Sequence, residues 1–370
     1  MTKTPAPSAP PETRATLARR PLLGGLATAA ALLGLGRRRP RAAEAVSAGA
    51  FGRGATLLVA GPDGGRLDHL SAVIAPALHR SLPPGTAIRR TAAGAADGVT
   101  GANQFAARAA PDGVSVLMVP GTAALDWLAG DARAHFDAAS WVPVMAGVWP
   151  GVVAGRLSAD ALGRGAKVRV AAGAPVGPDL PALLAIELLG ARAEPVFGFQ
   201  DADAVREAWR RGTVDLVFLH GSRVAQELAE VTALGAEPLF CLGVPQPSGA
   251  FGRDPLLPKI PALPELYAQL NGAPPAGLLF SAWCALAAAA QLDFALVLPQ
   301  LTPAALVALW RRAGAETADA LDVRATAAAE GFRPLAGPAA NASTAAVAAD
   351  AEALLELRQW LASRFDWHPG

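Results

Sequence analysis

A glycine-rich loop near the start of the chain carries the residue types with which proteins bind anions. The loop, residues 61–68, reads GPDGGRLD and follows a predicted strand, Ala55–Ala60. A loop of this kind that leads into a helix presents free backbone N–H groups, here those of Gly64 and Gly65, and the positive end of the helix dipole. Arg66 could pair with a carboxylate through two parallel hydrogen bonds. A plain strand-to-helix turn with a solvated arginine fits equally, because the loop lacks G-x-G-x-x-G and a Walker lysine–serine pair.

Two further residues near such loops have two possible roles each. Asp68 either holds a water that bridges to a ligand carboxylate or caps the helix that begins there. His220 follows a buried strand, Val214–Leu219, where it either donates a hydrogen bond to a ligand or lies on the surface.

A helix–turn–strand unit forms the centre of the first half of the chain. Gly101–Ala110 has one apolar face, the turn at residues 111–113 reads PDG, and Val114–Val119 is an apolar run typical of a buried parallel strand. Ligands of open α/β sheets bind beyond the carboxyl ends of the strands. We therefore expect the next residues, Gly121 and Thr122, to offer N–H groups and a hydroxyl to a small molecule.

A second series of strands and helices begins near Lys167 and ends in similar loops. Val168–Ala172 is a predicted strand, and its exit loop runs from Gly173 to Asp179. The alternation of strands with ten-residue helices favours a doubly wound, mostly parallel α/β arrangement. The apolar segment Gly277–Leu286 reads as one more strand.

The sequence contains no catalytic or metal-binding signature. It lacks G-x-S-x-G, H-E-x-x-H and a cysteine–histidine pair in a recognised context, and Ser222 is too close to His220 in sequence to imply a nucleophile and its base. Cys241 and Cys284 lie in apolar contexts, where they are either free thiols or a disulfide, and neither suggests a metal site. We expect no catalytic residues, no metal and no cofactor.

The first 45 residues read as an export signal. Arg19 and Arg20 precede a run without charge, Pro21–Gly36, which is followed by more arginines and by an A-x-A site at Ala43–Ala45. The paired arginines favour the twin-arginine route over general secretion, and an uncleaved anchor is the alternative. We expect cleavage near Ala45 and a periplasmic protein.

Removal of this leader changes the charge of the chain. The leader holds eight of the 32 basic residues and two of the 31 acidic ones, so that the remainder has a net charge of about −5. A mildly acidic body without a basic stripe excludes nucleic acid as a partner.

Six segments in order resemble the substrate receptors of tripartite tricarboxylate transporters, also called Bug-type periplasmic solute-binding proteins. The most specific is residues 101–119, similar to the family's G-A-x-x-x-A-x-A-x-P-D-G-Y-T-L-L. The others are similar to the family's first strand with its G-G-x-x-D loop, its aromatic-x-P-V step, G-x-V-D-L, L-P-x-V-P-x-x-x-E and the terminal G-x-x-P, and they lie at residues 57–68, 141–144, 212–216, 257–265 and 331–334.

The resemblance implies a two-domain, Venus-flytrap periplasmic-binding-protein fold (type II), with a mostly parallel sheet flanked by helices in each domain. Domain one would comprise residues 46–157 and 277–370, and domain two residues 158–276, with hinges near Leu157 and Gly277. The chain would be a monomeric receptor that closes on a small organic anion, mostly a carboxylate, for a membrane permease. The ligand-binding positions that the family motifs place here are Gly64, Gly65, Asp68, Gly121, Thr122, Gly173, Asp179 and His220.

The chain departs from the family pattern in domain two. Residues 174–178 contain no hydroxyl where the family has a Ser/Thr-rich loop, and Leu219-His220 replaces an Asp-Asn pair. These departures predict a ligand other than a simple dicarboxylate, or weak binding. A ligand sensor for a signalling partner and an exported hydrolase are the alternative functions.

Overall fold

The computed structural model describes residue 51, residues 54–199 and residues 201–368. The predicted leader lies outside these residues, and none of the described helices is long and apolar enough to cross a membrane. The described strands are β1 Ala55–Ala60, β2 Ile88–Ala93, β3 Ser115–Val119, β4 Val142–Val148, β5 Gly151–Gly155, β6 Lys167–Ala171, β7 Arg192–Val196, β8 Leu216–His220, β9 Glu237–Cys241, β10 Val244–Pro245, β11 Phe251–Gly252, β12 Leu292–Leu298 and β13 Arg333–Ala336.

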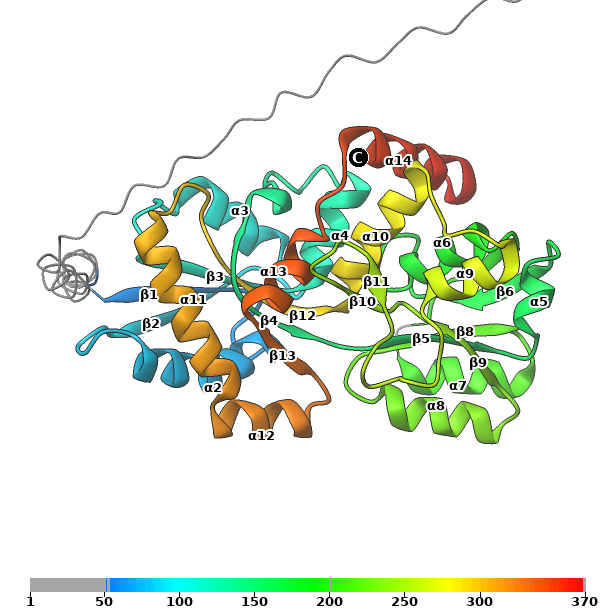
Figure 1. Cartoon of the computed structure of the whole chain (residues 1–370), viewed down its shortest axis with the longest axis horizontal. Coiled ribbons are helices and arrows are strands. Elements are labelled where there is room, and N and C mark those ends of the chain that lie inside the picture. Colours follow the sequence, from blue (N-terminus) through cyan, green and yellow to red (C-terminus); the bar gives the residue numbers. More distant parts are fainter. Residues whose placement is uncertain (1–50, 52–53, 200, 369–370) are drawn as a thin grey trace, which may run out of the picture. The chain divides into compact units, whose positions relative to one another are not determined.

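The helices cover these strands and connect them (Figure 1). They are α2 Arg66–Ser81, α3 Val99–Arg108, α4 Gly121–Ala129, α5 Ala159–Leu162, α6 Leu180–Leu188, α7 Ala202–Arg211, α8 Val224–Ala233, α9 Leu263–Asn271, α10 Leu278–Gln291, α11 Ala304–Asp319, α12 Leu321–Ala329, α13 Gly337–Ala345 and α14 Ala351–Phe365, with a 3-10 turn at Ala138–Ser140.

The strands form two mixed sheets and a short hairpin. The first sheet has the order β13-β4-β12-β3-β1-β2, the second has the order β7-β6-β8-β5-β9, and β10 pairs with β11. In the first sheet β12 runs antiparallel to both β3 and β4, and β13 runs antiparallel to β4. In the second sheet β5 runs antiparallel to β8 and β9. The expected two-sheet α/β fold is therefore confirmed, but the sheets are mixed and not mostly parallel as predicted, because β5, β12 and β13 run against their neighbours.

Both faces of the inner strands β1, β3, β4 and β12 are buried, which explains why these strands are almost wholly apolar, whereas the edge strand β2 carries the exposed Arg89 and Arg90. Successive side chains of β1 point to opposite faces. Leu57 and Val59 join the core under α2 and α11, whereas Leu58 and Ala60 join the core that contains α4, α10 and α14. The second sheet packs α7 and α8 on one face, with Trp209 fully buried there.

Helix α10 corrects one prediction. The segment Gly277–Leu286 was predicted to be a strand, but the chain from Leu278 to Gln291 is helical. Its apolar residues lie on all sides, so periodicity could not separate a buried helix from a buried strand. The five alanines between Trp283 and Gln291 favour the helix. Trp283 Nε1 donates to Pro181 O of α6 at 3.0 Å, which ties α10 to the helix beside the second sheet.

The chain crosses between the sheets earlier than the expected boundary at Leu157. β4 belongs to the first sheet and β5 to the second, so the first crossing is Trp149-Pro150. The return is made by α10, which leads into β12 of the first sheet.

Candidate functional site

The strand registers place the predicted loops of the first sheet at one edge. β1 and β3 are parallel neighbours, so the residues after Ala60 and after Val119 leave the sheet on the same side. β12 and β13 run the other way and begin at this edge, since Leu292 and Arg333 both pair with Val148, the last residue of β4. The edge therefore collects the β1–α2 loop, the start of α4, and the first residues of β12 and β13.

The corresponding edge of the second sheet lies next to this one. His220 ends β8 and pairs with Gly151, the first residue of β5. Only Trp149 and Pro150 separate that residue from the end of β4. A second contact joins the two edges, because a Cβ atom added to Gly331, whose φ is +67°, would lie 2.1 Å from Ser222 O.

In the β1–α2 loop, hydrogen bonds within the loop engage the predicted binding groups. The Gly64 N–H donates to Asp68 Oδ2 at 3.1 Å, and Arg90 Nη1 donates to Asp68 Oδ1 at 3.0 Å. A Cβ on Gly65 would lie 2.9 Å from Pro62, so the turn requires a glycine there. Asp68 closes this turn and forms an ion pair with Arg90, but it does not cap α2, because the N-cap is Gly65 and no side chain caps that end.

Arg66, the first residue of α2, is surrounded by acidic side chains. Its Nε and Nη2 donate to the two carboxylate oxygens of Asp293 at 2.9 and 2.7 Å, and its Nη1 donates to Glu330 at 2.8 Å. Its guanidinium carbon lies 4.5 Å from the ring centre of Trp149. Three of its five N–H donors are thus occupied, and the three charged groups sum to −1.

Burial controls the ionisation of this cluster. The Asp293 side chain is 1% exposed, whereas that of Arg66 is 38% exposed. Burial raises the pKa of Asp293, and the paired Arg66 opposes that shift without cancelling it. For Arg66, burial lowers the pKa, but the two carboxylates outweigh it and raise the pKa overall. The pair is a structural contact between α2 and β12, and it leaves no excess positive charge for an incoming anion.

The start of α4 is tightly packed. A Cβ on Gly121 would lie 1.9 Å from Ala289 O, so the helix N-terminus rests directly on α10. Thr122 Oγ1 donates to Asp97 O at 3.1 Å and retains its lone pairs as acceptors. A nine-residue helix that starts at the end of β3 directs its N–H groups toward this edge.

The second sheet contributes a close acidic–imidazole pair. Asp179 Oδ2 accepts from the Gly173 N–H at 2.8 Å. Burial raises the pKa of Asp179 and lowers the pKa of His220, while each attracts the charged form of the other. The His220 ring lies 5.4 Å from the Phe218 ring, and its buried Nδ1 has no hydrogen-bond partner among the described residues. The structure therefore brings Gly173, Asp179 and His220 together.

Three residues of these edges were not predicted from the sequence, namely Asp293, Glu330 and Arg333. Asp293 had a visible signal, since it is the only charged residue between Trp283 and Leu298. A lone carboxylate in an apolar run needs a cation or hydrogen-bond donors when it is buried. Glu330 and Arg333 lie at the end of α12 and the start of β13, and no sequence pattern distinguished them from surface charges.

The cysteines and the potential metal ligands are the remaining groups that could do chemistry. Cys241 and Cys284 are free thiols, and burial raises the pKa of Cys284 to about 12. Within the described residues no group of three His, Cys, Asp or Glu side chains is arranged to hold a metal ion.

Comparison with known proteins establishes the fold. No protein-family model and no curated protein sequence matches the chain. Among solved structures it is similar to a TctC solute binding protein from Polaromonas with no ligand (TM-score 0.59, 16% identity, covering 84% of this chain and 98% of that one). Weaker similarities are to the periplasmic binding protein BugD (TM-score 0.45, 16% identity, 84% and 96% covered) and to an R. palustris protein with adipate (TM-score 0.46, 18% identity, 84% and 96% covered). The chain has the two-sheet α/β fold of periplasmic binding proteins.

Proposed function

We propose that the protein is an exported solute receptor that captures a small organic anion, in particular a carboxylate, between the edges of its two sheets. The receptor would act in the periplasm as a monomer and deliver its ligand to the membrane permease of a tripartite tricarboxylate-type transporter. The observation that carries the proposal is that loops from both sheets converge where the chain crosses at Trp149-Pro150, in a fold shared with a TctC solute binding protein.

The mechanism follows from how the two sheets are connected. The connection at Trp149-Pro150 is only two residues long, so one sheet can rotate toward the other when a ligand contacts both edges. The start of α4 supplies N–H groups and the Thr122 hydroxyl from the first sheet. His220 supplies from the second sheet a ring nitrogen that has no hydrogen-bond partner in the described part of the chain. These are hydrogen-bond donors and acceptors for a polar ligand, and none of them is a nucleophile beside a base.

The test is ligand-dependent stability of the purified protein against mono-, di- and hydroxycarboxylates, with equal ionic strength of sodium chloride as the blank. A ligand at 100 times its Kd stabilises the native state by about 2.7 kcal/mol, which raises the Tm by several degrees at most for a chain of this length. Ligand-induced closure would also change the tryptophan fluorescence. If no carboxylate shifts the Tm or the fluorescence, the receptor proposal is wrong.

A pair of threonine variants separates binding from stability. Thr122→Val removes the hydroxyl at the candidate site and should weaken binding about 2- to 10-fold, the effect of one neutral hydrogen bond. The control is Thr326→Val on α12, whose hydroxyl likewise donates to a backbone carbonyl, that of Asp322, at 3.0 Å. It should leave the affinity unchanged.

A further inference from the structure

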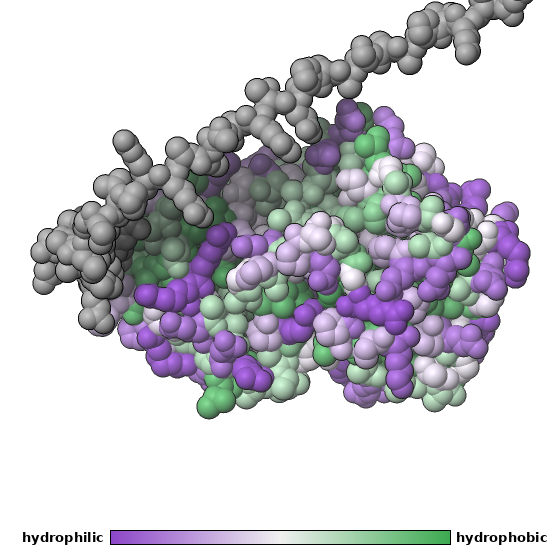
Figure 2. Space-filling model, in the orientation of Figure 1, coloured by the Kyte–Doolittle hydropathy of each residue, from purple (hydrophilic) through white to green (hydrophobic). Residues whose placement is uncertain are grey.

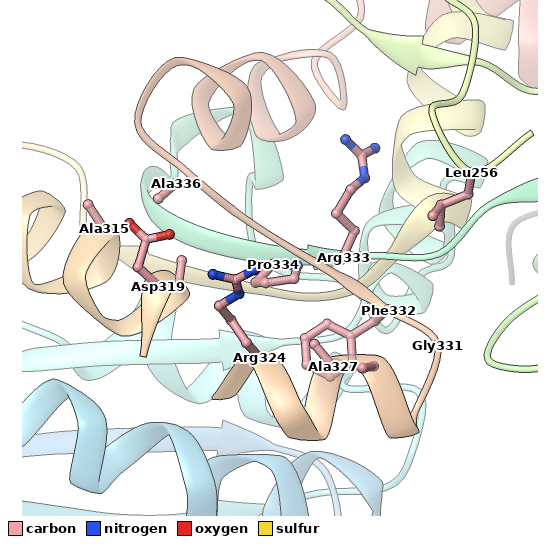
Figure 3. Close-up of a pocket in the computed structure, with 12 residues that line it drawn as sticks. Leu256, Ala315, Asp319, Arg324, Ala327, Gly331, Phe332, Arg333, Pro334 and Ala336 are labelled. Carbon is pink, nitrogen blue, oxygen red and sulfur yellow. The ribbon is translucent and has the colours of Figure 1, made fainter. Parts of the chain in front are cut away.

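A cavity of about 620 Å³ lies along β13, but its two arginines do not face one small occupant (Figure 3). Arg333 lies with Leu256 on one side of the β13 ribbon, whereas Arg324 lies with Asp319 on the other side. Hydrophilic and hydrophobic residues are mixed over the face shown in Figure 2, so a charged cavity is a clearer sign of a further site than an apolar patch. A pocket in which two cations share one lining lies elsewhere in the first sheet.

This second pocket, of about 190 Å³, lies between α3 and the beginnings of β1, β2 and β3. Part of its lining is apolar, because Leu58 of β1 and Phe105 of α3 meet there at the margin of the core. Six polar side chains supply most of the rest, namely Thr56, Arg89, Thr91, Gln104, Arg108 and Ser115. The apolar core between α3 and the sheet therefore ends in a polar recess.

The strand registers place three of these side chains in one row. Thr56 of β1 pairs with Arg89 of β2 and with Ser115 of β3. Paired residues of neighbouring strands point to the same face of a sheet. That face is the one that α3 covers, since Leu58, two residues after Thr56, joins the core to which α3 contributes. Arg108, the last residue of α3, lines the same pocket, so two guanidiniums and two hydroxyls converge there.

Neither arginine of the pocket has a counter-ion among the described residues. Arg90, the neighbour of Arg89 on β2, points to the other face and pairs with Asp68 at 3.0 Å. For Arg89 and Arg108, by contrast, no described carboxylate is close enough to form an ion pair. The four uncharged polar side chains of the lining likewise form no hydrogen bond to another described side chain or backbone group. All six groups are therefore available to a ligand or to water.

The charge and the donors of this pocket indicate the chemistry of its ligand. Two guanidiniums carry two positive charges, and the C-terminus of α3 offsets them by only about half a unit. A guanidinium binds a phosphate through two parallel hydrogen bonds, and hydroxyls can donate to the oxygens that remain. A carboxylate has only two oxygens, which a single guanidinium engages. The pocket is smaller than the roughly 300–1,000 Å³ of sites for drug-sized ligands, which favours a compact anion.

We propose that this pocket binds a phosphate group, with Arg89 and Arg108 on its oxygens and with hydrogen bonds from the Thr56 and Ser115 hydroxyls. The inference goes beyond the proposed receptor function and does not depend on it. β1 begins at this pocket and ends at the candidate site, and its six residues, at about 3.3 Å each, separate the two by about 20 Å. Both arginines are exposed, so inorganic phosphate and the phosphate monoester of a lipid headgroup can both reach the pocket.

The first experiment is calorimetric titration of the purified protein with sodium phosphate, with sodium chloride of equal ionic strength as the blank. Phosphate should bind saturably and chloride should not. Sedimentation with phosphatidylcholine vesicles, with and without phosphatidic acid, tests the lipid source. Binding to the phosphatidic acid vesicles alone, lost in Arg108→Gln, would assign the pocket to a lipid headgroup. If neither phosphate nor these vesicles bind, the inference is wrong, whereas the receptor proposal is decided by the carboxylates.

The second experiment locates the phosphate with variants and matched controls. Arg108→Gln should weaken phosphate binding about 10- to 100-fold, the effect of a charged hydrogen bond. Arg312→Gln removes an exposed arginine of α11 outside the pocket and should change the affinity by less than about threefold. Thr56→Val should weaken binding about 2- to 10-fold, and Thr326→Val should not. If Arg89→Gln and Arg108→Gln are folded and bind phosphate or the vesicles as tightly as the parent, the anion lies elsewhere and this inference is wrong.

Discussion

At the edge of the first sheet the charged side chains form ion pairs, whereas at the edge of the second sheet burial favours the neutral forms of the titratable side chains. Arg66 forms a bidentate ion pair with Asp293 and a further one with Glu330. Asp179 and His220 attract each other's charged forms, but burial shifts both toward their neutral forms. The ion pair of Arg66 fixes the position of α2, whereas the charge of the Asp179–His220 pair changes with pH. One edge of the candidate site is thus held by fixed ion pairs, and the other edge carries a pair that can titrate.

The strongest test of this difference is Arg66→Met. It leaves Asp293, whose side chain is 1% exposed, as a buried carboxylate without its arginine, and we expect the free energy of unfolding to fall by about 3 to 5 kcal/mol at pH 7. The double variant Arg66→Met/Asp293→Asn should recover much of this loss, because no charge remains buried. Urea unfolding measures both.

Arg80→Met is the matched control, since it also removes an arginine of α2 that binds an aspartate through both oxygens. The Arg80 and Asp322 side chains are 54% and 45% exposed, so this change should cost less than about 1 kcal/mol. Equal losses in the two single variants would show that burial does not distinguish the two pairs.

The glycines of the two edges give a second, smaller contrast. A Cβ on Gly121 would lie 1.9 Å from a backbone oxygen, but a Cβ on Gly173 would lie 3.1 Å from its nearest neighbour, Phe199 O. We expect Gly121→Ala to destabilise by about 2 to 3 kcal/mol and Gly173→Ala by less than about 1 kcal/mol. Thermal unfolding of both variants checks this, and a larger effect at Gly173 would mean that the second edge is the more tightly packed.

The sequence predicted the loops of these edges better than the contacts they make. Strand, loop and helix follow one another without interruption at Ala55–Ser81, so local patterns located Gly64 and Arg66 at a strand exit. The partner of Arg66 is 227 residues away, and only the register of β12 against β4 brings it there. The prediction of a strand in place of α10 has a different cause, because apolar residues on all sides of a helix leave no helical periodicity in the sequence.

The smallest effect concerns the pH dependence of the second edge. Burial lowers the pKa of His220 in the folded protein, so between that lowered value and 6.5 the unfolded chain binds more protons than the native one. Stability should therefore rise with pH in this window, with a slope of at most about 1.4 kcal/mol per pH unit. His220→Gln should remove that slope.

Asp179→Asn tests the other member of the pair with the opposite sign. Because burial raises the pKa of Asp179, the native state binds more protons than the unfolded chain between pH 3.8 and the raised value. The free energy of unfolding therefore falls as the pH rises through this window. The amide keeps an oxygen to accept from the Gly173 N–H. Stability curves measured from pH 4 to 7 should therefore differ from the parent in opposite directions for the two variants. Parallel curves would mean that the pair does not titrate in the folded protein, and that both edges hold fixed charges.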